Sequence, residues 1–469
     1  MKTINKKYWI ILYGLIIGIV FDLFFYDKTL GISYPLFIVL ILIIIALVIY
    51  KKNKRSKNLF LLWMIPILLL SITFAIYSNM VLKYLNYLLV PLLLLIMIST
   101  LSDTNRADWG DIRFIADIFK RLFPFIALFR VKSNDSVKDK KVLFRVGIGL
   151  LVSIPLLFII ILLLSSADMV FRDLFYFNFS QLAKHILVVL VISLYSICFF
   201  WALAKAIDGN VVSKYKKINW RRFLDPIVLI TILGILNIVY CVFSVIQFRY
   251  LFSGVLPSEY TYAEYARRGF FELVVVSLIN FIIILIAVWF LKMDENKTLK
   301  AARTLLTVLV CFTFIVLTSA FYRMVLYEQA YGFTYLRIFV QAFMVLLFLL
   351  FMLNTVFIWY ERFPIIKACF IVTIVVYIAL NFSNVDAIIA RNNIKRYEKT
   401  GQIDMAYLKS LSYDSIQEIS LLADDKSKSE EIMIYFRSVK KDLAELKDWQ
   451  NTNLSRIKAK EIVSRYTEK

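Results

Sequence analysis

The sequence has few of the residues that usually build catalytic and metal sites. It contains a single histidine, His185, so motifs in which two histidines bind one metal cannot occur. Its twelve glycines form neither a phosphate-binding loop nor a dinucleotide-binding fingerprint, which makes ATP-driven chemistry within the chain unexpected. We therefore expect no cofactor and no metal. Because His185 stands beside Lys184 at the start of an apolar segment, we interpret it as an interfacial residue.

Cysteine is also scarce. The sequence has four cysteines, each inside a different apolar segment: Cys198, Cys241, Cys311 and Cys369. None belongs to a Cys-x-x-Cys pair, so the spacing indicates neither a disulfide framework nor a zinc site.

Apolar residues dominate what is present. They make up 61% of the chain, and the mean hydropathy is +0.75, which excludes a large water-soluble core. Most apolar segments are about 20 residues long, enough for a helix to cross the roughly 30 Å hydrocarbon layer of a membrane. The sequence thus predicts an all-α, polytopic membrane protein.

We expect about eleven transmembrane helices, with ends uncertain by a few residues. The predicted spans are 8–26, 32–50, 59–79, 82–101, 143–165, 185–206, 226–251, 269–291, 302–322, 337–359 and 366–383. The first span has a basic start like a secretory signal, but it is long and lacks a small-residue cleavage site, so we expect a retained helix. Gly14 and Gly18 within it form a pair of small residues that suits a close helix contact.

The basic residues, which give a formal net charge of +22, gather in short connections between spans instead of forming one basic domain. This pattern follows the positive-inside rule and gives no indication of nucleic-acid binding. The clusters are Lys2, Lys6 and Lys7; Lys51, Lys52, Lys54, Arg55 and Lys57; Lys214, Lys216, Lys217, Arg221 and Arg222; and Lys292, Lys297, Lys300 and Arg303. They predict a cytoplasmic N-terminus in the plasma membrane, and an odd number of spans then predicts an extracytoplasmic C-terminus. If the last span, 366–383, lay in the interface instead, the tail would fall inside.

Two domains are expected. Residues 1–383 form the multi-pass domain, with an amphipathic helix near 111–130 lying in the inner interface. Residues 384–469 form a small helical tail, since apolar residues such as Ile432, Phe436 and Val439 recur at helical spacing. Within the tail, Ser427 and Glu430 resemble a capping box, and Gly401 is placed to end a helix.

Ionisable residues near the outer helix ends are the candidate site. Glu264, Arg268 and Glu272 are four residues apart and would form one charged stripe on a helix, extended towards the membrane middle by Asn280. Glu272 enters an apolar run, where a carboxylate costs several kcal/mol unless it is paired.

A second polar group closes one span and opens the next; it includes Arg323, Glu328, Tyr331 and Arg337. Both groups are predicted on the outer side, where they could line one ligand-binding vestibule. An aromatic interface belt with structural ion pairs explains the tyrosines equally well, but it does not explain Glu272.

Several of these segments carry a resemblance to a known family. The stretches at 262–273 and 331–337, with 384–392 and 404–408 in the tail, resemble a bacterial multi-pass membrane family known as domain of unknown function 4173. The resemblance covers the second half of the chain closely and the first half only by hydropathy. It implies kinship and a bacterial membrane location, but no activity.

Three classes of function compete. The first is a non-enzymatic protein of the bacterial cell envelope, which binds a lipid, a peptide or, through its tail, a protein partner. The second is a secondary transporter of a small solute, with its site at Arg268, Glu272, Asn280 and Arg323. It predicts broken helices and paired halves, whereas the sequence shows no internal repeat.

The third is a lipid-linked glycosyltransferase, a class with an acidic residue in the first outer connection. Asp22 and Asp27 occupy suitable positions. The connection between the first two spans is only a few residues long, however, and leaves no room for an elaborated catalytic loop. A non-enzymatic role with membrane lipid as a partner is the first expectation.

Overall fold

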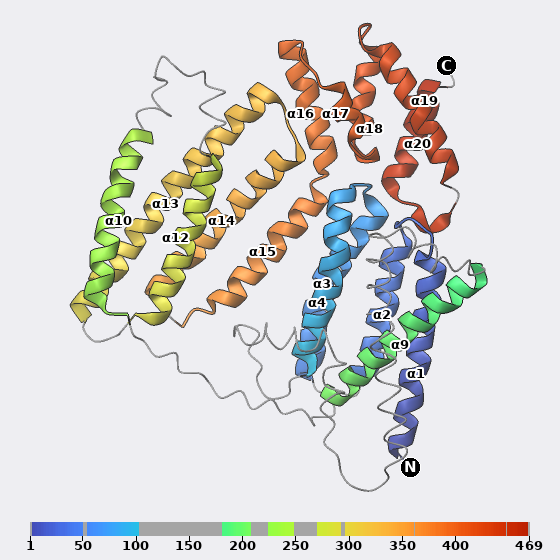
Figure 1. Ribbon diagram of the computed structural model, residues 1–469, viewed down its shortest axis with the longest axis horizontal. Coiled ribbons are helices and arrows are strands. Elements are labelled where there is room, and N and C mark those ends of the chain that lie inside the picture. The colour runs from blue at the N-terminus through green and yellow to red at the C-terminus, as the bar shows by residue number, and fades with distance from the viewer. Residues whose placement is uncertain are drawn as a thin grey trace, which may run out of the picture. The chain divides into compact units, whose positions relative to one another are not determined.

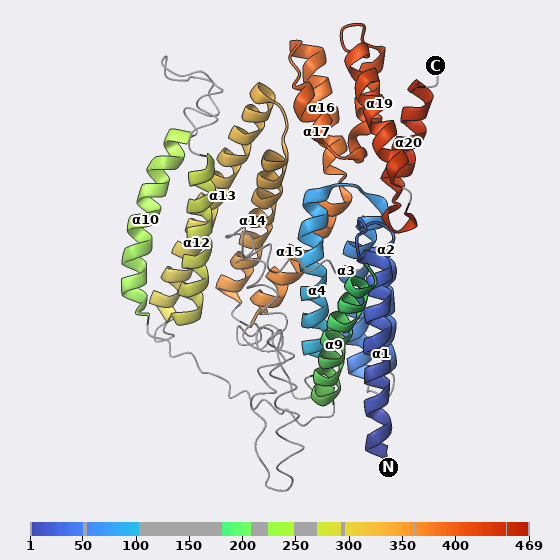
Figure 2. The same ribbon diagram turned by 45° about the vertical axis from the view of Figure 1, so that its right-hand side comes forward.

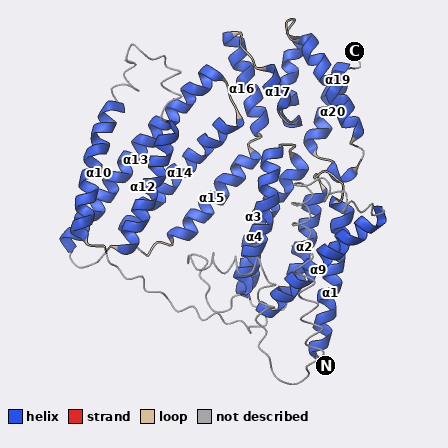
Figure 3. Ribbon diagram, in the orientation of Figure 1, coloured by secondary structure: helices blue, strands red, loops and turns tan. Residues whose placement is uncertain are grey.

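The computed structural model describes residues 2–49, 54–102, 181–207, 224–247, 270–291, 296–360, 362–446 and 448–467. Within these ranges the chain is helical, and the one β interaction is an isolated bridge between Leu224 and Leu291 (Figure 3). The described chain divides into two compact units, which are considered separately below.

The first unit holds α1, α2, α9, most of α3 and α4, and the short tail segment Asp448–Thr452. The helices are α1 (Lys2–Phe25), α2 (Ser33–Ile49), α3 (Lys54–Ile76), α4 (Met80–Ser102) and α9 (Gln181–Ile207). The second unit holds residues Ile76–Asn86, the later membrane helices and nearly all of the tail. Its membrane helices are α10 (Pro226–Gln247), α12 (Phe270–Phe290), α13 (Asn296–Tyr331), α14 (Tyr335–Trp359) and α15 (Ile365–Phe382).

The predicted spans coincide with these helices, except for 143–165, which lies outside the described residues together with the predicted interfacial helix near 111–130. Six of the described helices are long and apolar enough to cross a membrane, and four shorter apolar helices accompany them. The chain is thus a multi-pass membrane protein, while the count of about eleven spans remains a prediction. The largest difference is α13, whose 36 residues extend well beyond the predicted 302–322.

In the first unit, α1 and α9 pack closely, as the small residues Gly14 and Gly18 predict. A Cβ atom at Gly14 would lie 2.3 Å from the Ile197 side chain, and one at Gly18 would lie 1.9 Å from Ser193 Oγ. Larger residues would push the two helices apart, so the glycines set their separation.

In the second unit, α13 is the central membrane helix and packs against α10, α12 and α14, while α15 packs on α14 (Figures 1 and 2). Its core is apolar and includes Leu306, Leu309 and Ala320 of α13 and Phe351 of α14. All of these helices are uninterrupted.

The tail is helical, as the sequence predicts. Its α-helices are α16 (Val385–Thr400), α17 (Met405–Ser410), α18 (Ile416–Ile419), α19 (Ser429–Glu445) and α20 (Leu454–Thr467), joined by short 3₁₀ turns. Gly401 ends α16 in a left-handed conformation and its N–H donates to Tyr397 O. Helix α19 buries the predicted face that contains Ile432, Phe436 and Val439. The predicted capping box is wrong, because Ser427 Oγ donates to Asp425 instead of capping α19.

Candidate functional site

Helix α13 contributes four buried polar side chains to the second unit. Thr313, Ser319, Arg323 and Glu328 are all buried and occur at intervals of four to six residues. From the first to the last is 15 residues, or about 22 Å along the helix axis. Helices α10, α12 and α14 supply partners for these side chains, which form three separate groups.

The first group lies near the middle of the membrane helices. Tyr240 of α10 donates its hydroxyl to Asn280 Oδ1 at 2.8 Å, and Asn280 Nδ2 donates to Thr313 Oγ1 at 2.9 Å. Thr313 in turn donates to the carbonyl of Leu309 at 2.7 Å. This group satisfies the amide of Asn280 on both sides and ties three helices together.

The second group lies about two to three turns further along α13. Gln247, at the end of α10, accepts two hydrogen bonds at Oε1: one from Ser319 Oγ at 2.6 Å and one from Arg323 Nη2 at 3.0 Å. Both partners are buried, so a single amide oxygen holds a neutral and a cationic donor in place.

The third group is at the end of α13. Glu328 is only 2% exposed; its Oε2 accepts from Gln341 Nε2 at 2.7 Å, while its Oε1 has no hydrogen-bond partner among the described residues. Arg337 lies over the ring of Tyr327, 4.3 Å from its centroid, and donates to the carbonyl of Gly332. Tyr331 is half exposed and its ring contacts that of Tyr327.

The predicted charged stripe is not continuous. Glu264 and Arg268 lie outside the described residues. Glu272 is exposed in the first turn of α12, where the partial positive charge of the helix end favours a carboxylate. Asn280 is fully buried. The eight-residue step from Glu272 to Asn280 turns the helix by about 80° beyond two full turns, so the two side chains face different surroundings.

A polar centre that the sequence does not reveal lies where the tail meets the membrane helices of its own unit. Asp386 of α16 is fully buried and accepts from Asn79 Nδ2 at 2.5 Å, from the Tyr335 hydroxyl and from Ser412 N at 3.0 Å. The sequence indicates Asp386 only as an acidic residue in a first helical turn. Its three partners come from distant parts of the chain, so no local pattern could have identified them.

Asp414 is a second tail carboxylate that accepts hydrogen bonds in the same region. Its Oδ2 accepts from the backbone N–H groups of Ser78 and Asn79, at 2.8 and 3.0 Å, immediately before α4 begins. Burial raises the pKa of Asp414 above its ordinary value. Asp414 therefore stabilises the backbone N–H groups just before α4, and Asp386 holds the side chain of Asn79 beside them.

The tail also clamps the turn between α13 and α14. Asn393 accepts from Phe333 N at 2.8 Å and donates to Phe333 O at 2.9 Å, while Arg396 donates to the carbonyls of Gln329 and Ala330. Gly332 occupies this turn with φ of +85°. Tyr407 then accepts at its hydroxyl from Tyr335 N. Three of the segments that carry the family resemblance, 331–337, 384–392 and 404–408, thus lie together.

A family model described as "Domain of unknown function (DUF4153)" matches residues 64–422. The chain belongs to this family. The resemblance to an uncharacterised family is therefore confirmed at that level, although the number 4173 is not the one that matches. No curated protein and no solved structure gives a significant match to the chain.

The region shared with the DUF4153 family includes the groups along α13, Asp386 and the clamp on the α13–α14 turn. Asp22 and Asp27 precede it. Asp22 interacts with His185 Nδ1 at 2.9 Å, and the ring of Tyr26 packs on the imidazole. His185 therefore joins α9 to α1, beyond the interfacial position predicted for it. Asp27 lies in the turn after α1 with φ of 53°.

Proposed function

We propose that this DUF4153 protein is a non-enzymatic integral protein of the bacterial cell envelope, and that it binds the ammonium-bearing headgroup of a membrane lipid at an outer vestibule. The vestibule consists of Arg323, Glu328, Arg337 and Gln341, at the tail-side ends of α13 and α14. The observation that carries the proposal is the buried carboxylate of Glu328, whose Oε1 has no hydrogen-bond partner in the part of the chain that the structure describes.

The length of α13 supports a vestibule at headgroup depth. Its 36 residues measure about 54 Å, whereas the hydrocarbon layer is about 30 Å thick. A helix centred in the layer extends about 12 Å beyond it at each end, which is the length of its last eight residues. Glu328 is three residues from the end, which places it at headgroup depth.

Charge at the two ends of α13 supports an outer position for the vestibule and the tail. The first turns of α13 contain Lys297, Lys300 and Arg303, while the opposite end is bound by Arg396 of the tail. The positive-inside rule assigns the basic end to the cytoplasm. The tail and the C-terminus are then extracytoplasmic, where the tail is also available to a protein partner.

Sidedness can be measured with single cysteines. In a variant whose four native cysteines are replaced by serine, Ser438→Cys in the tail and Lys297→Cys at the start of α13 each provide one exposed thiol. We expect a membrane-impermeant maleimide to label Ser438→Cys in intact cells and Lys297→Cys only after lysis. The reverse result would place the tail in the cytoplasm and remove the outer vestibule.

Ligand chemistry can be tested with two lipids that differ in hydrogen-bond donors. Phosphatidylethanolamine has an ammonium group with N–H donors, whereas phosphatidylcholine has the same charge without them. We expect native mass spectrometry to show preferential retention of phosphatidylethanolamine. Glu328→Gln should reduce its affinity about tenfold, since hydrogen bonds to charged groups contribute about 1.5–3 kcal/mol.

Glu272→Gln is the matched control, because it makes the same chemical change at an exposed residue of α12. It should leave lipid selectivity unchanged. Equal retention of both lipids by the unmodified protein, or an equal effect of the two substitutions, would refute headgroup binding at Glu328.

A second candidate function, the secondary transporter, is favoured by polar groups in the middle of the helices. Asn354 of α14 is fully buried, and neither its Oδ1 nor its Nδ2 has a partner among the described residues. The Tyr240–Asn280–Thr313 group lies in the same bundle. The uninterrupted helices argue against alternating access.

Proton flux distinguishes the two functions. Liposomes that contain the protein and an entrapped pH-sensitive dye should respond to a pH gradient no faster than protein-free liposomes. A faster response that Asn280→Leu abolishes would favour the transporter.

A further inference from the structure

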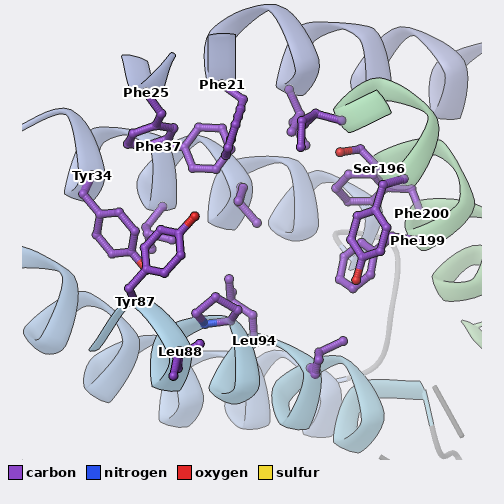
Figure 4. A pocket seen from close by; sticks show the side chains of 17 residues that line it. Phe21, Phe25, Tyr34, Phe37, Tyr87, Leu88, Leu94, Ser196, Phe199 and Phe200 are labelled. Carbon is purple, nitrogen blue, oxygen red and sulfur yellow. The ribbon is translucent and has the colours of Figure 1, made fainter. Parts of the chain in front are cut away.

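Four helices of the first unit surround a cavity of about 410 Å³. Figure 4 shows Phe21, Phe25, Tyr34, Phe37 and Tyr87 around one end of the space, with Phe199 and Phe200 at the other. The remaining lining residues are Ile17, Ile38, Ile41, Leu88, Pro91, Leu94, Leu95, Ile192, Tyr195 and Ser196. The volume is within the range of about 300–1,000 Å³ that is typical of ligand pockets.

The lining is almost entirely hydrocarbon, but it includes one polar group that lacks a partner. Tyr34 is only 4% exposed, and its hydroxyl has no hydrogen-bond partner among the described residues. Buried hydroxyl groups are normally hydrogen-bonded, because leaving one without a partner destabilises the protein. The side chains that line the cavity therefore have no apolar atoms to pack against on that side, and the Tyr34 hydroxyl has no hydrogen-bond partner among the described residues.

Tyr34 marks the end of the cavity that lies near the helix ends. Tyr34 is at the start of α2 and Phe25 is at the end of α1, so both lie where these helices end. Ile17 and Ile41 lie deeper in the same helices. Each wall spans eight or nine residues, so the cavity extends about 12 Å along the helix direction.

One side of the cavity is open. Leu88 and Tyr87 of α4 and Tyr195 of α9 are 71%, 45% and 44% exposed, whereas Ile17 of α1 and Ile38 of α2 are buried. A ligand can therefore enter sideways between α4 and α9, at a depth where the surrounding medium is lipid.

We propose that the cavity binds one hydrocarbon chain of a membrane lipid, whose first oxygen accepts a hydrogen bond from the Tyr34 hydroxyl. Protein interiors are close-packed, and an apolar space of this size does not bind water well. Acyl chains are the abundant apolar molecules at this depth. This site lies in a different unit from Glu328 and does not depend on the proposed headgroup site.

The test uses phosphatidylcholine with a photoreactive diazirine in its acyl chain, incorporated into proteoliposomes of the full chain. After illumination, we expect label on the lining residues of α1, α2, α4 and α9. Ile41→Trp should lower that label about tenfold, because the indole occupies the deep end of the cavity. The matched control is Ile43→Trp, two residues further along α2 at an exposed position, which should leave the label unchanged.

Tyr34→Phe removes only the hydroxyl and should lower the label about threefold. It also keeps the proposal testable if Ile41→Trp does not accumulate. Glu328→Gln should leave this label unchanged, so the outcome here is separate from that of the headgroup experiment. Equal labelling of Ile41→Trp and Ile43→Trp, or label confined to exposed helix faces, would overturn the proposal.

Discussion

The two units fill the space between their helices in different ways. In the second unit, the rings of Phe281 and Phe314 meet that of Phe351 with centroids 5.7 and 6.3 Å away, and Asn280 finds its partners on neighbouring helices. In the first unit, aromatic rings surround an open volume, and the Tyr34 hydroxyl has no hydrogen-bond partner among the described residues. The difference is therefore one of packing, since side chains fill the core of the second unit, whereas the first unit leaves space for a ligand.

The comparison also explains why burial alone does not identify a site. Asn280 and Asp386 are both fully buried, but each is satisfied by side chains from other helices. Glu328 and Tyr34 each retain one unsatisfied polar atom. We therefore base binding proposals on the second pair and expect mutations of the first pair to affect stability.

The largest expected effect concerns Asp386, in the second unit. Asp386→Ala leaves Asn79, Tyr335 and Ser412 without their acceptor and should lower the free energy of unfolding by about 3–5 kcal/mol. Thermal unfolding of the purified protein would measure this loss. Asp424→Ala, at an exposed tail position, should change stability by less than about 0.5 kcal/mol. Similar effects of the two substitutions would mean that the buried network adds little.

A smaller effect is expected when one phenylalanine in each unit is replaced by alanine, which compares packing in the two units directly. Phe351→Ala creates a cavity in a filled core and should cost about 3 kcal/mol or more. Phe37→Ala only enlarges a cavity that already exists and should cost about half as much. Melting temperatures of both variants, measured in one detergent, would test this. An equal loss would indicate that the first unit is as tightly packed as the second.

The smallest effect is a pH dependence at the junction with the tail. Because burial raises the pKa of Asp414, the folded state binds its proton more tightly than the unfolded state. The resulting stabilisation is complete below the ordinary pKa of about 3.8 and is lost as pH rises through the folded-state value. Its slope is at most about 1.4 kcal/mol per pH unit.

Asp414→Asn removes this titration. Melting temperatures between pH 4 and pH 7 should therefore fall less steeply for the variant than for the unmodified protein. Parallel curves would show that Asp414 does not change its protonation on unfolding.

Features set by local sequence were predictable. Hydropathy located the membrane helices, and the spacing of Gly14 and Gly18 predicted a close contact that the structure places between α1 and α9. The apolar face of α19 also followed from helical periodicity. Each depends on residues within a few helical turns of one another, whose relative positions follow from the regular geometry of the α-helix.

Features set by contacts between distant residues were not predictable. Ser427 and Glu430 have the spacing of a capping box, yet the Ser427 hydroxyl forms hydrogen bonds with Asp425 and Tyr397 instead. Glu272 and Asn280 share a helix but not a face. The environment of Glu328 depends on Gln341, across the α13–α14 turn. A single sequence identifies such residues as polar without revealing their partners.

The clamp on the α13–α14 turn has a consequence for sequence variation. Asn393 recognises Phe333 only through its backbone N–H and C=O, and a Cβ atom at residue 332 would lie 2.7 Å from Asn393 Oδ1. The clamp therefore does not itself select the side chain at position 333, which packs against the tail core, whereas the glycine at 332 and the asparagine at 393 must persist or change together.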